Sequence, residues 1–156
     1  MPYILKELRP YYNELIYKIA FEIKDATDLD IGVYASSFKS HIISSKPESI
    51  DGEFNYFLTK LFIKLNWVGD SLTYYNYMHC SKKIDKLVQE CLTIYTPSYF
   101  NYNRAIGMLN CCQLEFRRRY DNKSIMATTF LQLIIKKLYD EIGIYEDKKL
   151  ILNGDV

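Results

Sequence analysis

Glycine and proline are scarce in this chain, which has six glycines and four prolines among 156 residues. No apolar run reaches the roughly 18–20 residues that a helix needs to cross a bilayer, so we expect no membrane-spanning segment. The opening segment, MPYILKELRP, has charges within its apolar stretch and no small-residue cleavage site, which argues against a secretory signal. The four cysteines lack the pattern of a disulfide framework. These absences predict a cytoplasmic protein with free thiols.

Neither sign of charge dominates, because 20 basic residues face 19 acidic ones and the formal net charge is +1. A protein with this balance has no overall positive electrostatic potential that would attract nucleic acid or anionic lipid, so we expect neither a nucleic-acid nor a membrane partner. Hydrophobic residues make up 49% and charged residues 25% of the chain, which is ordinary globular usage. The length fits a single domain over residues 1–156.

Alanine and arginine are also rare, with five of each. Phenylalanine, tyrosine, methionine, isoleucine, asparagine and lysine together supply 69 residues. The rare types are encoded by GC-rich codons and the frequent types by AT-rich codons, which indicates an AT-rich genome. We therefore interpret the fifteen tyrosines mainly as codon bias, although tyrosine is also a rigid contact residue.

Apolar residues recur at helical spacing along most of the chain, and strand-type alternation is nearly absent. The pattern is clearest over 54–65, where Asp51 is the expected N-cap. The predicted fold class is all-α, a compact bundle of about five to six helices with a short irregular C-terminal tail. The segments with helical spacing are 10–24, 31–44, 54–65, 72–95, 98–119 and 122–142.

The long apolar stripes also predict how these helices pack. The segment 98–119 is apolar on most sides, which is typical of a central helix, and Gly107 within it predicts a close approach by another helix. Gly143 is the expected end of the last helix. We expect one core cluster to join two of the segments: Phe57, Leu58, Leu61, Ile106, Leu109 and Phe116.

Catalytic and metal-binding patterns are weak throughout. His79 and Cys80 are adjacent, so on a helix they point about 100° apart, which favours a polar surface histidine over a nucleophile pair. Cys111 and Cys112 lack the spacing of a zinc or redox site, and we expect both to be buried. His41 has no second histidine at ligand spacing, and no two carboxylate pairs face each other as magnesium would require. We therefore expect no metal, no cofactor and no catalytic residue.

Four blocks of the sequence resemble a known family: MPYILKELRP, DGEFNYFLTKL, SYFNYNRAIGMLNCCQLEFRRR and YEDKKLILNGDV. They are similar to small uncharacterised proteins of bacteriophages and bacteria that share an MPYI start, a GELNYxxTKL helix, an IGxLECxKLEFYRR helix and a YEDKKxxENGDV ending. This chain departs from the family pattern at Asn110, Gln113, Arg117 and Leu152, and it looks expanded. The resemblance implies a viral or mobile-element setting, hence the host cytoplasm if the protein is viral, and implies no mechanism.

Two functions remain open from the sequence. The first is a non-enzymatic protein that acts through protein–protein contacts, with a protein partner or by self-association. The alternative is a nucleotide-binding or nucleotide-hydrolysing protein that uses an arginine and carboxylate site, because the planar guanidinium fork suits phosphate. The candidate ligand-binding residues for the alternative are Glu115, Arg118, Arg119, Glu146, Asp147 and Asp155.

Two surface expectations complete the sequence analysis. The segment from residue 145 to the chain end is expected to fold back along the helix that ends in Arg118 and Arg119, with at least one arginine–carboxylate contact. The candidate contact surface is the tyrosine-rich stretch that includes Tyr74, Tyr75, Tyr77 and Met78, because aromatic residues and methionine are enriched at interfaces.

Overall fold

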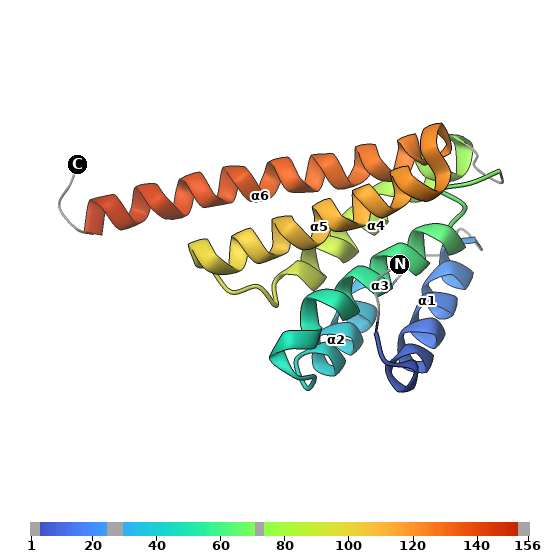
Figure 1. Ribbon diagram of the computed structural model, residues 1–156, viewed down its shortest axis with the longest axis horizontal. Coiled ribbons are helices and arrows are strands. Elements are labelled where there is room, and N and C mark those ends of the chain that lie inside the picture. Colours follow the sequence, from blue (N-terminus) through green and yellow to red (C-terminus); the bar gives the residue numbers. More distant parts are fainter. Residues whose placement is uncertain (1–3, 25–29, 71–73, 153–156) are drawn as a thin grey trace.

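The computed structural model describes residues 4–24, 30–70 and 74–152 (Figure 1). Within these residues the chain forms helices and no strand, so the all-α prediction is confirmed. Each of the six predicted segments corresponds to one α-helix, and three short 3-10 turns complete the elements. In chain order these are η1 (Lys6–Leu8), α1 (Arg9–Lys24), α2 (Ile31–Ile42), η2 (Pro47–Ser49), α3 (Ile50–Lys64), α4 (Tyr74–Leu92), α5 (Tyr99–Tyr120), η3 (Asp121–Ser124) and α6 (Ile125–Leu152).

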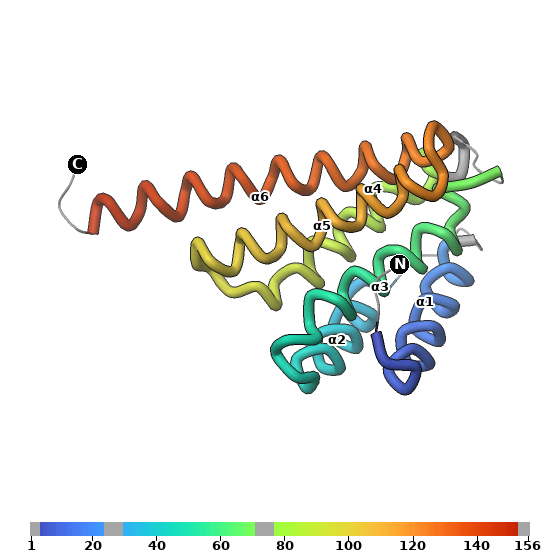
Figure 2. The backbone as a smooth tube through the Cα atoms, in the orientation of Figure 1, coloured from blue at the N-terminus to red at the C-terminus, as the bar shows by residue number. Residues whose placement is uncertain are grey.

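The most enclosed helix is α3. All seven residues from Glu53 to Thr59 are buried, so this stretch has no exposed face. The tube trace shows α1 and α2 on one side of α3 and the longer helices α5 and α6 on the other (Figure 2). Helix α4 packs against α2, where Nζ of Lys39 in α2 lies 3.8 Å from Oε2 of Glu90 in α4. The expectation that 98–119 lies at the centre is therefore wrong, and α5 exposes Gly107, Cys111 and Leu114 to solvent. Cys112 is buried as expected, whereas the prediction that Cys111 is also buried is wrong, and the four cysteines are free.

Helices α3 and α5 run parallel to each other. Near their starts, Arg104 donates to Asp51 with a 3.0 Å bond from Nη2 to Oδ1. Near their ends, the ring of Phe62 stacks on that of Phe116 with centroids 5.9 Å apart. Because the contacts follow the same order along both helices, the chain needs a return path between them, and α4 supplies it.

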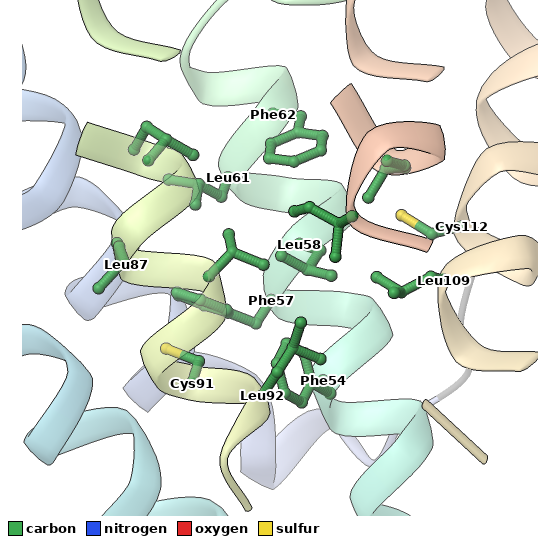
Figure 3. Close-up of a cluster of buried hydrophobic side chains, with 14 of the residues drawn as sticks. Phe54, Phe57, Leu58, Leu61, Phe62, Leu87, Cys91, Leu92, Leu109 and Cys112 are labelled. Atoms are coloured by element: carbon green, nitrogen blue, oxygen red, sulfur yellow. The ribbon is translucent and has the colours of Figure 1, made fainter. Parts of the chain in front are cut away.

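The predicted core cluster is confirmed. Its six members, which are 0–5% exposed, are Phe57, Leu58, Leu61, Ile106, Leu109 and Phe116. Figure 3 shows Leu109 of α5 beside Leu58 of α3, and Leu87 of α4 on the other side of α3. The apolar stripes of three helices therefore meet around α3, as their spacing requires.

A second aromatic cluster lies where the chain leaves α3. Trp67 is fully buried, and its ring lies 4.9 Å from Phe62, 5.0 Å from Tyr77 and 5.1 Å from Phe130, measured between centroids. These rings come from α3, α4 and α6. The turn is tight here, since Asn66 and Gly69 both have positive φ angles, of 60° and 88°. The cluster therefore fixes the start of α6 against the end of α3.

The last helix is longer than the sequence predicted. Gly143 was expected to end it, but α6 continues through Gly143 to Leu152. No atom outside the helix lies within 4 Å of a Cβ built on Gly143, and this glycine does not adopt a positive φ, so nothing local stops the helix. Figure 1 shows the end of α6 reaching beyond the start of α5. Residues 153–156 of the expected tail lie outside the described residues.

Local signals at the helix starts were predicted with mixed success. Ser98, the first residue of the predicted segment 98–119, caps α5, because its hydroxyl accepts a 3.0 Å bond from the backbone N–H of Asn101. Asp51 does not cap α3, which begins at Ile50 with Ser49 at the N-cap position, two residues earlier than predicted. Gly107 was expected to admit another helix, but no neighbouring atom lies within 4 Å of its built Cβ. Within the described residues, no helix has the length and hydropathy to cross a membrane.

Truncating the core should be costly where the structure encloses it. Leu109→Ala should lower the free energy of unfolding by about 2–5 kcal/mol, because Leu109 is fully buried and a cavity would remain. Leu114→Ala on the same helix is the matched control, since Leu114 is 63% exposed, and its cost should stay within about 0.5 kcal/mol. Urea unfolding measures both. Equal costs for the two variants would contradict the core assignment.

Candidate functional site

The six candidate ligand-binding residues separate into groups in the structure. Glu115, Arg118 and Arg119 lie near the end of α5, whereas Glu146 and Asp147 lie near the end of α6. Helices α5 and α6 are antiparallel and joined by η3, so about 30 Å of helix separates the two groups. The sixth candidate, at position 155, lies outside the described residues. The described candidates therefore do not converge in one pocket.

Glu115 holds two of the three arginines at the end of α5. Its Oε1 atom lies 2.8 Å from Nη2 of Arg118 and 2.8 Å from Nε of Arg119. The hydrogen bond from Arg118 lowers the pKa of the Glu115 carboxyl from 4.5 to about 2. Both guanidinium groups thus bind a carboxylate of their own helix, and they also place positive charge at the negative end of its dipole. This geometry supports a structural role for the cluster.

The predicted docking of the tail is wrong for its described part. Residues 145–152 continue α6 and leave the bundle, and their side chains are largely exposed. Among the described residues, neither Arg118 nor Arg119 forms an ion pair with Glu146 or Asp147. The physical reason is the uninterrupted helix at Gly143, which carries these carboxylates away from the end of α5.

We name residues 144–152 the α6 extension, because they follow the last buried residue of α6, Ile142. Tyr145 still reaches the bundle, where its ring lies 6.2 Å from that of Tyr102. Beyond it the side chains of Leu150, Ile151 and Leu152 are 43%, 64% and 85% exposed. An ordered helix thus presents apolar residues that the described part of the chain does not cover.

Four consecutive charged residues, Glu146 to Lys149, stand between the apolar residues at the two ends of the α6 extension. Ile144 and Ile151 are seven residues apart and share one face, with Asp147 and Lys148 between them. The Nζ atom of Lys149 lies over the ring of Tyr145, 5.8 Å from its centroid. No ion pair joins Asp147 or Lys148 to any other residue that the structure describes. This face therefore has both apolar and charged groups available to a partner.

The tyrosine-rich stretch at the start of α4 contributes less surface than expected. Tyr77 packs against Trp67, with ring centroids 5.0 Å apart, so its ring belongs partly to the interior. Met78 is 57% exposed. The side chains of Tyr74 and Tyr75 lie outside the described part of the structure. Of the two residues of this predicted surface whose side chains the structure describes, only Met78 is exposed.

The sequence analysis missed a buried carboxylate. Glu53 is 0% exposed and accepts three hydroxyl hydrogen bonds, from Tyr12 at 2.7 Å, Ser45 at 2.8 Å and Ser49 at 2.6 Å. Burial and the bond to Glu53 raise the pKa of the Tyr12 hydroxyl. The Ser49–Glu53 spacing of one helical turn was a visible signal, whereas Tyr12 is 41 residues away.

A cavity of about 630 Å³ adjoins this buried carboxylate. Glu53 has no exposed surface, and the Nε2 atom of His41 is also buried, while the His41 ring stacks on Tyr11 at 3.8 Å. Three hydroxyls already donate hydrogen bonds to the Glu53 carboxylate, so the cluster of Glu53 and its donors has a structural role. The cavity is lined by Ile4, Leu5, Leu8, His41, Ser44, Ser45, Lys46, Glu48, Ser49, Gly52 and Glu53. Within the described residues, no three histidine, cysteine, aspartate or glutamate side chains gather to hold a metal ion.

Comparison with known proteins adds no relative. No model of a protein family matches the chain. No curated protein and no solved structure matches it either. The function must therefore be inferred from the side chains and surfaces of this chain.

Acid should remove the stabilisation that Glu115 provides. Because its pKa falls from 4.5 to about 2 on folding, this contribution is present above about pH 4.5 and is lost as the pH falls through about 2. The difference in unfolding free energy between wild type and Glu115→Gln should shrink across that window, as measured by urea unfolding at several pH values. The control Glu14→Gln removes an exposed pair with Lys18 and should change stability little. A pH-independent difference for Glu115→Gln would contradict the assignment.

Removing one hydroxyl from the Glu53 cluster should be costly. Tyr12→Phe deletes a buried donor to a carboxylate, so the free energy of unfolding should fall by about 1.5–3 kcal/mol. Tyr11→Phe is the neighbouring control, because its hydroxyl donates to the exposed carbonyl of Ser37, and its cost should be smaller. Thermal and urea unfolding compare them. A cost for Tyr11→Phe equal to that for Tyr12→Phe would show that burial of the carboxylate is not the cause.

Proposed function

We propose that this protein is a non-enzymatic helical module that acts through protein–protein contacts made by the α6 extension. The observation that carries the proposal is a helix that leaves the bundle with Ile144, Ile151 and Leu152 all more than half exposed. Proteins often bind one another by packing the apolar face of a helix into a hydrophobic groove of the partner.

The physical argument concerns the stability of a short unpacked helix. Isolated helices shorter than about 12–15 residues are marginal in water, because nucleation is costly and packing normally supplies the stability. The α6 extension gains its nucleus from the packed part of α6, but its apolar side chains other than Tyr145 remain exposed. Contact with another protein would bury them and stabilise the helix.

The ionisable groups of the bundle support a binding role over a catalytic one. The carboxylate of Glu53 is enclosed by three hydroxyls, and that of Glu115 is bound by two arginines. Each of these groups is already satisfied by its own chain. The resemblance to small phage and bacterial proteins adds the setting that we propose, which is the cytoplasm of a bacterium or of an infected host.

Site-specific photocrosslinking tests this function. The full chain is produced in bacterial cytoplasm with benzoylphenylalanine at Ile151, or at Leu114 as a control with similar exposure of 63% on α5. Irradiation should give discrete protein adducts from position 151, because the α6 extension is the contact surface. The same adducts should vanish when Ile144→Asp is added.

The control decides whether the adducts are specific. Position 114 should give no discrete adduct. If positions 151 and 114 behave alike, or if position 151 gives none, the α6 extension is not a protein contact and the proposed function fails.

A further inference from the structure

The α6 extension is complementary to itself when it is read in the opposite direction. The midpoint of residues 144–151 lies between Asp147 and Lys148, and Ile144 and Ile151 stand at equal distances on either side. An acidic residue on one side of the midpoint thus matches a basic residue on the other. This pattern is what a two-fold axis needs, because such an axis brings each residue against its mirror position in the second copy.

The matching residues also lie on one face of the helix. Ile144 and Ile151 are seven residues apart, which is two helical turns. Asp147 and Lys148 follow Ile144 by three and four residues, so they flank the line between the two isoleucines on opposite sides. Both isoleucines are more than half exposed, at 56% and 64%, and Asp147 and Lys148 are exposed as well.

We infer that the partner of the α6 extension is a second copy of this chain. This inference rests on the proposed function, that the α6 extension is a protein contact. The two extensions pack antiparallel about an axis between Asp147 and Lys148. Ile144 of each copy packs on Ile151 of the other, and Asp147 of each copy pairs with Lys148 of the other.

Charge selects the antiparallel arrangement. In an in-register parallel pair, each Asp147 would face Asp147 of the second copy and each Lys148 would face another lysine, which is unfavourable. In the antiparallel pair both contacts join opposite charges, and the two helix dipoles oppose each other. Neither residue has an ion-pair partner among the described residues of its own chain, so no existing bridge is lost.

The shape of the molecule leaves room for this pairing. Figure 1 shows the end of α6 beyond the ends of the neighbouring helices, so two bundles would sit at opposite ends of the paired extensions. The extension is about 13 Å long, from Ile144 to Leu152. Such a contact is smaller than the interfaces of about 1,200–2,000 Å² in stable complexes. The dimer should therefore be weak and should form as the protein concentration rises.

Charge reversal with exchange of partners tests the inference. Sedimentation equilibrium of the wild-type chain should show monomers becoming dimers with concentration. Asp147→Lys alone or Lys148→Asp alone should weaken association by at least about tenfold, because each places like charges together at both contacts. An equimolar mixture of the two variants should regain dimers, and the double variant Asp147→Lys/Lys148→Asp should do the same.

Two neighbouring charges supply the matched control. Glu146 is two residues after Ile144, and Lys149 is two residues before Ile151, so both lie on the opposite face of the helix. Glu146→Lys and Lys149→Glu should leave the dimerisation constant unchanged, although they alter the net charge as the test variants do. Circular dichroism at low concentration should show the bundle intact in every variant.

The results separate this inference from the proposed function. A wild-type chain that stays monomeric, single reversals that leave the dimer unaffected, or a mixture that fails to regain dimers would each overturn the second copy as partner. If the chain is monomeric but position 151 still crosslinks to a different protein, the second copy is excluded while the protein-binding function stands. If neither dimer nor adduct forms, both fail.

Discussion

The burial of one carboxylate determines how the first half of the chain is assembled. Glu53 has no exposed surface, and a carboxylate removed from water is costly unless hydrogen bonds replace the lost solvent. Its donors come from α1 through Tyr12 and from the connection between α2 and α3 through Ser45 and Ser49. Two segments must therefore reach the start of α3 in a fixed arrangement. The rest of α3 then provides the surface on which α4 and α5 pack.

The helices and their apolar contacts could be predicted from the sequence because both follow local periodicity. The stripes that contain Leu61 and Leu109 had to be buried, and they meet in the core. The central place of α3 could not be predicted in this way. Its polar residues Glu53, Asn55 and Thr59 are buried, and the hydrogen bonds to Glu53 include one from a tyrosine 41 residues away. Burial of polar residues depends on such distant partners, which periodicity does not reveal.

The candidate site shows the same division between local and distant information. The pairing of Glu115 with Arg118 and Arg119 follows from spacings of three and four residues on a helix. Whether the carboxylates of the last segment reach these arginines depended on where α6 ends. Gly143 suggested an end that the structure does not have, since a glycine with ordinary helical angles interrupts nothing. The extension became visible as a surface when the full length of α6 was known.

The enclosed position of Trp67 has a consequence for observing this protein in solution. It is the single tryptophan of the chain, and it lies where residues of α3, α4 and α6 meet. Its fluorescence should be blue-shifted in the native state and should shift to the red when water reaches the indole. When the excitation wavelength is long enough to excite tryptophan and not tyrosine, the emission therefore reports how well the junction of these three helices excludes water. The end of α6 lies far along the helix from this indole, so events there would leave the emission spectrum unchanged.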